Sequence, residues 1–192
     1  MNFMNTGSIK GLIASIGRPN ERPAKKGIGE DKLKYVNPKL CTECGGACCK
    51  RCGCEFSPDD FSEISFETLK NEIEKGYISI DFAYGEEILR SSGVYFLRAR
   101  NAGRPIVDTE DVRGSGCILL TDSGCKLDYE QRPSGGRLLI PAEEKKYFLG
   151  ENTRICKSDY KIEECCDEWI PFQEIIGELI NYFKDKDFPC SI

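Results

Sequence analysis

The chain has 192 residues, a formal net charge of −5 and no histidine. This length suits one domain with a tail, and the negative charge argues against a general nucleic-acid binder. The absence of histidine excludes the Ser/His and Cys/His pairs that activate many nucleophiles. The sequence also lacks the glycine motifs that bind phosphates and dinucleotides. No catalytic residue can be assigned, so enzymatic activity stays open.

The twelve cysteines could form disulfides or bind metal. Six disulfides would need an export signal, and the apolar stretch over 11–17 is too short to serve as one. No window reaches the length of a membrane span, so no membrane association is expected. The expected location is the cytoplasm, where thiols stay reduced and available to metal.

The first 40 residues differ in charge from the rest. They hold eight Lys and Arg against three Asp and Glu, whereas the remainder holds nineteen against twenty-nine. Glycines, prolines and scattered cations predict a basic, loosely structured arm over 1–40. A cysteine-cluster metal-binding domain is expected over 41–184, followed by a short C-terminal tail over 185–192.

Six cysteines then fall within residues 41–54, and two more follow later in the chain. Because no histidine is present, sulfur must supply most of the coordination, which favours zinc or an iron–sulfur cluster over magnesium or calcium. The run is expected to be a loop that wraps an ion, with glycines permitting its tight turns. The candidate metal ligands are Cys41, Cys44, Cys48, Cys49, Cys52, Cys54, Cys117 and Cys125.

The spacing leaves the number of metal sites open. Cys41 and Cys44 form a Cys-x2-Cys pair that can reach one ion from one turn. Cys48 and Cys49 are adjacent, so their side chains diverge, which suggests two neighbouring sites or one extended cluster. Eight sulfurs suffice for two four-coordinate sites, and equally for one site with spare thiols. Cys44, Cys49 and Cys52 fit the Cys-x4-Cys-x2-Cys spacing of plant-type ferredoxins. This match is weak evidence, because cysteines are so dense in this segment.

The elements that follow the run are short. Residues 57–76 predict two helices, with caps at Ser57 and Ser65 and a stop at Gly76. A stripe of apolar residues predicts helix near the C-terminus, where Pro171 begins a new helix or kinks the old one. Strands are expected at 77–82, 94–97 and 106–107. The prediction is an α+β fold, mostly helical, with one minor β-sheet and a cysteine-rich metal site.

Four cysteines outside the two clusters receive no firm role. Cys165 lies on the apolar helical stripe, where a cysteine is usually a small buried residue, and Trp169 is expected in the core. A further metal site built from Cys156, Cys165 and Cys166 is the less favoured alternative. The four residues are Cys156, Cys165, Cys166 and Cys190.

The second cysteine segment completes a family pattern. Over 117–141 it reads Cys-x7-Cys, then Arg-Pro-x3-Arg and a further proline. Together with Cys-x2-Cys-x3-Cys-Cys over 41–49, this resembles a bacterial cysteine-cluster family known as a zinc- or iron-chelating domain. The resemblance covers roughly residues 41–141. It implies metal binding through Cys41, Cys44, Cys48, Cys49, Cys117 and Cys125.

One position departs from the pattern of that family. The family has a further cysteine after Arg-Pro-x2, where this chain has Gly136. Cys52 or Cys54 is expected to supply the missing sulfur. Arg132 of the same segment is expected to order it against acidic side chains.

Three functions are compatible with these patterns. Zinc can act as a structural clamp on loops that a small core cannot hold. An iron–sulfur cluster can transfer electrons or support a partner enzyme. The third alternative is an accessory or catalytic subunit that modifies a protein or a small molecule. The expected partners are a metal ion and, for the last two functions, another protein.

Overall fold

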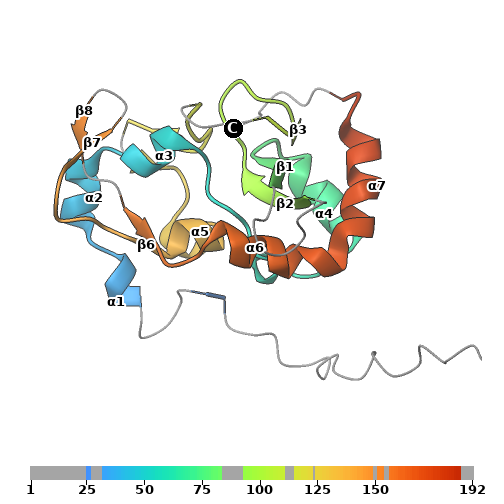
Figure 1. The fold of residues 1–192 in the computed structure, drawn as a ribbon, viewed down its shortest axis with the longest axis horizontal. Coiled ribbons are helices and arrows are strands. Elements are labelled where there is room, and N and C mark those ends of the chain that lie inside the picture. Colours follow the sequence, from blue (N-terminus) through green and yellow to red (C-terminus); the bar gives the residue numbers. More distant parts are fainter. Residues whose placement is uncertain are drawn as a thin grey trace, which may run out of the picture.

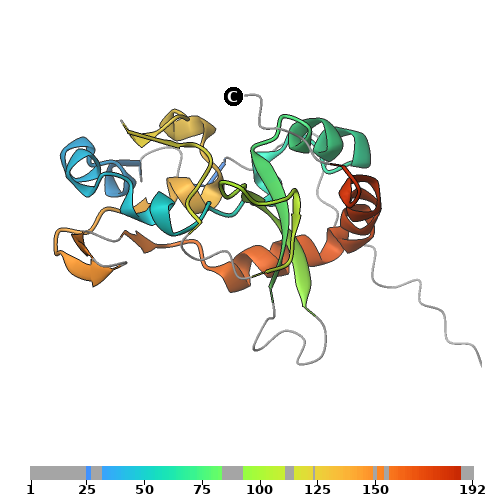
Figure 2. The same ribbon diagram turned by 90° about the horizontal axis from the view of Figure 1, so that it is seen from above.

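A computed structural model describes residues 25–26, 32–83, 93–110, 115–122, 124–148, 151–153 and 156–186. The cysteine-bearing segments gather on one side of the molecule, and a small sheet with its helices forms the other side (Figure 1). Seen from above, the same two halves lie next to each other (Figure 2). Helices together with small sheets confirm the predicted α+β class.

The sheet half is built on three strands in the order β2-β1-β3. Strand β1 (Ile78–Ala83) pairs antiparallel with β2 (Val94–Ala99) and parallel with β3 (Val107–Asp108). These strands lie where the sequence predicts them, but β2 continues two residues further than expected. That extension brings Arg98 into the sheet, opposite Ser79.

Two capped turns lead into this sheet. A 3-10 turn, η1 (Pro58–Asp60), follows Ser57, whose side chain accepts a hydrogen bond from a backbone N–H of the turn. Helix α4 (Phe66–Ile73) follows Ser65, which caps it in the same way. Gly76 ends the stretch with a φ of 87°, a value that favours glycine. The two predicted caps are therefore confirmed.

The C-terminal helices cover the sheet. Helix α6 (Ile162–Trp169) passes through the 3-10 turn η3 (Ile170–Phe172), which contains the predicted proline, into α7 (Gln173–Phe183). Helices α6 and α7 pack against β2, and α4 packs against α7. The largest buried apolar side chains of this core are Leu69, Ile73, Ile78, Ile80, Phe96, Leu97, Trp169, Ile176, Leu179 and Phe183.

The cysteine half consists of very short elements. Its helical parts are α1 (Lys32–Tyr35), α2 (Pro38–Cys44), α3 (Ala47–Arg51), η2 (Tyr129–Gln131) and α5 (Ser134–Arg137). Its strand pairs are β4 (Leu120–Thr121) with β5 (Gly124–Cys125), β6 (Leu139–Ile140) with β9 (Lys157–Ser158), and β7 (Lys146–Phe148) with β8 (Glu151–Thr153). The prediction of one sheet is wrong, because strands of two or three residues leave no periodicity in a sequence.

The basic arm is only partly described. Its described lysines pair with acidic side chains of the body: Lys26 with Glu164 and Glu168, Lys32 with Glu130, and Lys34 with Asp159. The rest of the predicted arm, 1–24 and 27–31, and residues 187–192 of the predicted tail lie outside the described residues. Within the described residues, no helix has the length and apolar character needed to cross a membrane.

Candidate metal centre

The first cysteine segment forms two short helices and not the predicted loop. Helix α2 ends at Cys44 and α3 begins at Ala47, and Gly45 and Gly46 join them with φ of 58° and 76°. Such left-handed turns suit glycine, since it has no Cβ. The turn places the thiol of Cys48 within hydrogen-bonding distance of the thiol of Cys44. The loop prediction failed because helices this short carry no clear sequence pattern.

Cys48 lies at the centre of a group of thiols. Its Sγ atom is 3.7 Å from the Sγ atom of Cys156. Hydrogen bonds with the thiols of Cys156, Cys44 and Cys49 lower the pKa of Cys48. The same interactions with Cys48 raise the pKa of Cys44 and of Cys49. Cys48 thus ionises most readily in this group, and the thiolate is the form that binds metal.

The second cysteine segment lies directly against the first. The backbone N–H of Cys117 donates a hydrogen bond of 2.6 Å to the carbonyl of Cys49. Cys125 lies in the β4–β5 hairpin, paired with Leu120. Burial raises the pKa of Cys117 to about 11. The two segments are therefore in contact, as the sequence predicts.

A cavity of about 100 Å³, called here the thiol cavity, lies between these segments. Its apolar wall includes Ala99, Leu119 and Leu139, which limit contact with water. The cysteines that line it are Cys44, Cys48, Cys49, Cys54, Cys117, Cys125 and Cys156. Cys41 lies in α2, but its side chain is outside the described part of the chain. Most of the predicted ligands are thus gathered around one space.

Cysteine thiolates are suitable ligands for zinc and iron, but the sulfurs of these cysteines do not all lie around one point. Within the described residues, no group of three or more Cys, Asp or Glu side chains is placed so that it could hold an ion. None of the ten described cysteines forms a disulfide. A sulfur-rich space with an apolar wall is the environment that zinc and iron sites use.

Cys52 and Cys54 both line a neighbouring cavity of about 550 Å³. Only Cys54 also lines the thiol cavity. Cys48, Cys54 and Cys156 line both, so they form the wall between them. Burial raises the pKa of Cys52 and of Cys54.

Gly136 also lines the thiol cavity. A Cβ atom added at Gly136 would lie 3.7 Å from the Cβ of Cys54 and 3.4 Å from that of Arg132. Cys54 therefore carries its sulfur beside the position where the family pattern has a cysteine. Between the two candidates that the sequence offers for the missing sulfur, this geometry favours Cys54.

Arg137, and not Arg132, orders the second segment against an acidic side chain. Arg137 is buried and its Nη2 lies 2.5 Å from Oδ1 of Asp60. The other carboxylate oxygen of Asp60 accepts a hydrogen bond of 2.8 Å from the backbone N–H of Ser134. Arg132 instead donates to the carbonyl of Leu127. The arginine–aspartate pair thus fastens α5, and with it Gly136, to η1.

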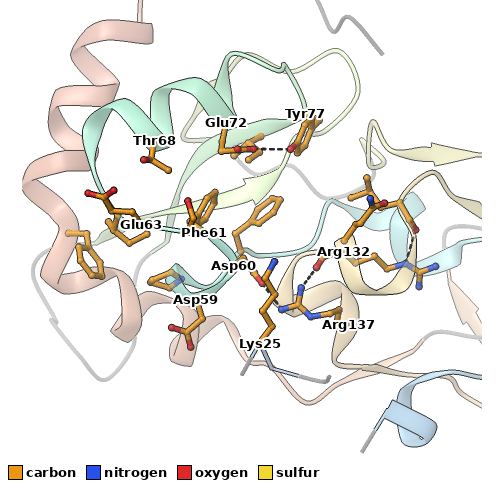
Figure 3. Close-up of a pocket in the computed structure, with 18 residues that line it drawn as sticks. Lys25, Asp59, Asp60, Phe61, Glu63, Thr68, Glu72, Tyr77, Arg132 and Arg137 are labelled. Carbon is orange, nitrogen blue, oxygen red and sulfur yellow. Dashed lines mark hydrogen bonds and ion pairs between the residues drawn. The ribbon is translucent and has the colours of Figure 1, made fainter. Parts of the chain in front are cut away.

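A third cavity, of about 700 Å³, lies on the other side of this pair (Figure 3). Asp60 and Arg137 line it together with Glu72 and Tyr77, whose hydroxyl donates to Glu72. None of the described cysteines lines this cavity. Arg132 is the one described lining residue that this cavity shares with the thiol cavity.

The C-terminal cysteines divide into two kinds. Cys165 and Cys166 are buried in α6, where the Sγ of Cys165 lies 3.6 Å from the carbonyl of Phe56. Trp169 is fully buried and donates to the same carbonyl at 2.8 Å. The prediction that Cys165 and Trp169 belong to the core is confirmed. Cys156, which lacks any pattern in the sequence, joins the thiol cavity instead.

A comparison with protein-family models gives one match. Residues 40–157, well over half of the chain, match the model described as "CxxCxxCC: Putative zinc- or iron-chelating domain". This range includes every cysteine that lines the thiol cavity. No curated protein and no solved structure matches the chain.

Proposed function

Because the chain belongs to the CxxCxxCC family of zinc- or iron-chelating domains, we propose that its clustered cysteines hold zinc as a structural clamp. The cysteine half has helices of only four to seven residues and strand pairs of two or three. Such elements bury little apolar surface and need a further link between them. Thiolate-bound zinc supplies that link in small domains, where its binding energy becomes folding energy.

The contact between Cys48 and Cys156 is the observation that supports zinc best. Two thiolates on one tetrahedral ion, each about 2.3 Å from it, lie about 3.8 Å apart. The two sulfurs are separated by 3.7 Å. A [4Fe–4S] cluster takes one cysteine per iron, so its cysteine sulfurs stay further apart, whereas a [2Fe–2S] cluster binds two cysteines on each iron, as zinc does. A pair at the observed distance therefore suits one shared metal atom, and the short elements of the cysteine half favour zinc in the role of a clamp.

The proposed ligands follow the family pattern with one replacement. Cys41, Cys44, Cys48, Cys49, Cys117 and Cys125 come from the pattern, and Cys54 takes the place of the cysteine missing at Gly136. Cys156, whose sulfur contacts that of Cys48, completes the set. A backbone group supports one of these ligands, since the N–H of Ala47 donates a hydrogen bond of 3.3 Å to the Sγ of Cys44. That hydrogen bond stabilises a thiolate and fixes its direction.

A metal analysis of the anaerobically purified protein tests the function. We expect a colourless protein that contains zinc, and a Cys44→Ser variant that contains less of it. A brown protein that contains iron and sulfide would replace zinc with an iron–sulfur cluster. A protein without either metal, after reconstitution with both, would overturn metal binding through these cysteines.

The replacement by Cys54 can be tested by removing its sulfur and placing a cysteine at position 136, where the family pattern has one. Cys54→Ser should lose zinc about as severely as Cys44→Ser. Adding Gly136→Cys to Cys54→Ser should restore zinc, because the two Cβ positions are 3.7 Å apart. Adding Gly136→Cys to Cys44→Ser serves as the control and should restore nothing. Full zinc content in Cys54→Ser alone would refute the replacement.

A second candidate function is redox or enzymatic support of a protein or small-molecule modification. The cavity beside the thiol cavity favours it, because three thiols of the thiol cavity also line this space of about 550 Å³. Arg98 and Asp81 provide charged groups there. A small molecule in this space would lie next to a bound metal. A reversible, metal-dependent redox signal in voltammetry would favour this function over the clamp.

Reduced thiols are a requirement of either function. We propose a cytoplasmic location, since a reducing compartment keeps cysteines available to metal. The lack of disulfides among the described cysteines is consistent with this proposal.

A further inference from the structure

We propose that Asn101 is a positioning residue of the metal centre, and that its side-chain amide donates a hydrogen bond to the sulfur of Cys117 when that sulfur binds metal. The inference rests on the proposed function and names a residue that the cysteine motifs do not contain. Asn101 follows strand β2 by two residues and is 1 % exposed. It contacts both cysteine segments, the first at Gly53 and the second at Cys117.

The side-chain amide of Asn101 is held in one orientation. The backbone N–H of Gly53 donates a hydrogen bond of 2.7 Å to Oδ1 of Asn101. Because only the oxygen of a side-chain amide accepts hydrogen bonds, this contact decides which atom of the group is oxygen and which is nitrogen. Nδ2 cannot exchange places with Oδ1 without losing the bond to Gly53.

The Nδ2 atom of Asn101 is a buried donor. Within the described part of the chain, no atom accepts a hydrogen bond from it. A buried polar group costs free energy unless it is paired, so native proteins nearly always pair it. A metal-bound thiolate is a suitable acceptor, because its negative charge strengthens a hydrogen bond from an amide. Such a thiolate is present only in the metal-bound protein.

Cys117 carries the sulfur that is placed to accept this bond. Asn101 and Cys117 form an antiparallel β-bridge. The flanking backbone hydrogen bonds, each 2.9 Å long, join the direct neighbours of this pair, Ala102 with Gly116 and Ile118 with Arg100. Asn101 and Cys117 are therefore a non-hydrogen-bonded pair, whose side chains project from the same face with Cβ atoms about 4.5–5.5 Å apart. Since Cys117 lines the thiol cavity, the amide lies beside a proposed ligand.

Cobalt(II) loading of the full chain provides the test, because cobalt reports its thiolate ligands through charge-transfer absorption. A hydrogen bond lowers the energy of the sulfur lone pairs, so its loss should move this absorption to longer wavelength. We compare the wild type with Asn101→Leu and with the control Ser79→Ala, which removes a buried hydroxyl that does not line the thiol cavity. We expect the shift in Asn101→Leu alone, with zinc affinity lowered about 10- to 100-fold.

The accepting sulfur is identified by repeating Asn101→Leu in two backgrounds at saturating cobalt. In Cys117→Ser the substitution should cause no further shift, because the accepting sulfur is already gone. In Cys44→Ser it should shift the absorption as it does in the wild type. Equal shifts in both backgrounds would assign the amide to another sulfur and overturn the inference.

The outcomes separate this inference from the proposed function. If the wild type shows no thiolate–cobalt absorption, the proposed function fails, and the inference fails with it. If Cys44→Ser loses absorption while Asn101→Leu matches the wild type, only the role of Asn101 fails. Should Asn101→Leu not fold, NMR of the isotope-labelled wild type decides: zinc should move a side-chain amide proton of Asn101 downfield and slow its exchange with water. An unchanged proton would overturn the inference.

Discussion

Asp81 is a buried carboxylate in β1, and it lines the cavity of about 550 Å³ that adjoins the thiol cavity. It is 3 % exposed. Its Oδ2 lies 3.2 Å from Nη1 of Arg98, and its Oδ1 accepts a hydrogen bond of 2.6 Å from the hydroxyl of Ser79. Burial outweighs both interactions and raises the pKa of Asp81 to about 6. The native state therefore binds this proton more tightly than the unfolded chain does.

The raised pKa of Asp81 predicts a pH-dependent effect of Asp81→Asn. The favourable contribution of the protonated group is fully present below about pH 4 and is lost as pH rises through about 6. Asparagine does not titrate, so the variant should gain stability relative to the wild type over this range, by about 2–3 kcal/mol. Urea unfolding of both proteins at pH 4 and pH 7 measures the difference.

Metal effects cancel in this comparison, because both proteins keep all their cysteines. A difference in unfolding free energy that stays constant between the two pH values would contradict the titration of Asp81. A relative loss of stability at pH 7 would show that the ion pair with Arg98 outweighs burial.

The sequence alone predicts the roles of some residues and not of others. Trp169 and Cys165 could be assigned to the core because both fall on a helical apolar stripe. Arg137 and Cys156 could not be assigned, because their partners Asp60 and Cys48 are distant in the chain. Contacts of this kind depend on the tertiary fold and leave no local pattern.

At the scale of elements, the first cysteine segment is fixed to the sheet by its own backbone. The N–H of Ala99 in β2 donates to the carbonyl of Cys54 at 2.9 Å, and the N–H of Gly53 donates to Oδ1 of Asn101 at 2.7 Å. A Cβ atom at Gly53 would overlap the carbonyl oxygen of Ala99. The approach of the segment to β2 therefore requires glycine at this position.

Gly53→Ala should separate the cysteine segment from β2. We expect a loss of more than about 3 kcal/mol in unfolding free energy, beyond ordinary overpacking, since backbone must move. Zinc binding should weaken as well, because Cys54 would shift. Thermal unfolding and zinc content measure both effects.

Gly45→Ala is the matched control in the same segment. Its Cβ would meet nothing within 4 Å, although its φ of 58° is strained for alanine. The expected cost is only about 1–2 kcal/mol. Equal destabilisation by the two substitutions would argue against the close approach at Gly53.

Element length explains how much of the fold could be predicted. Helix α4 and strands β1 and β2 have six to eight residues, and their caps and alternation were visible in the sequence. The two-residue strands β6 and β9 carry no such pattern, yet their pairing positions Cys156. The candidate ligands could therefore be found from cysteine spacing, whereas their arrangement in space could not.

The whole molecule combines two halves with different sources of stability. The sheet half has most of the large buried apolar side chains. The cysteine half consists of short helices and short strand pairs (Figure 1). If zinc acts as the clamp, its removal should loosen the second half first. The first half retains its own apolar core.

Chelation followed by amide hydrogen exchange tests this difference. After zinc removal, exchange should accelerate in α3, α5 and the β6–β9 pair, while α7 and β1 keep their protection. Restoring zinc should reverse the change. A uniform loss of protection across both halves would show that the metal stabilises the molecule as one cooperative unit.

The polypeptide leaves the ribosome N-terminus first, so the order of its cysteines is also an order in time. Cys48 is synthesised 108 residues before Cys156, whose sulfur it contacts in the finished protein. The pairing of β9 with β6, which positions Cys156, forms only when nearly all of the cysteine half has been made. The early thiols thus spend most of translation without their final neighbour, and the Cys48–Cys156 contact belongs to the completed chain and not to the nascent one.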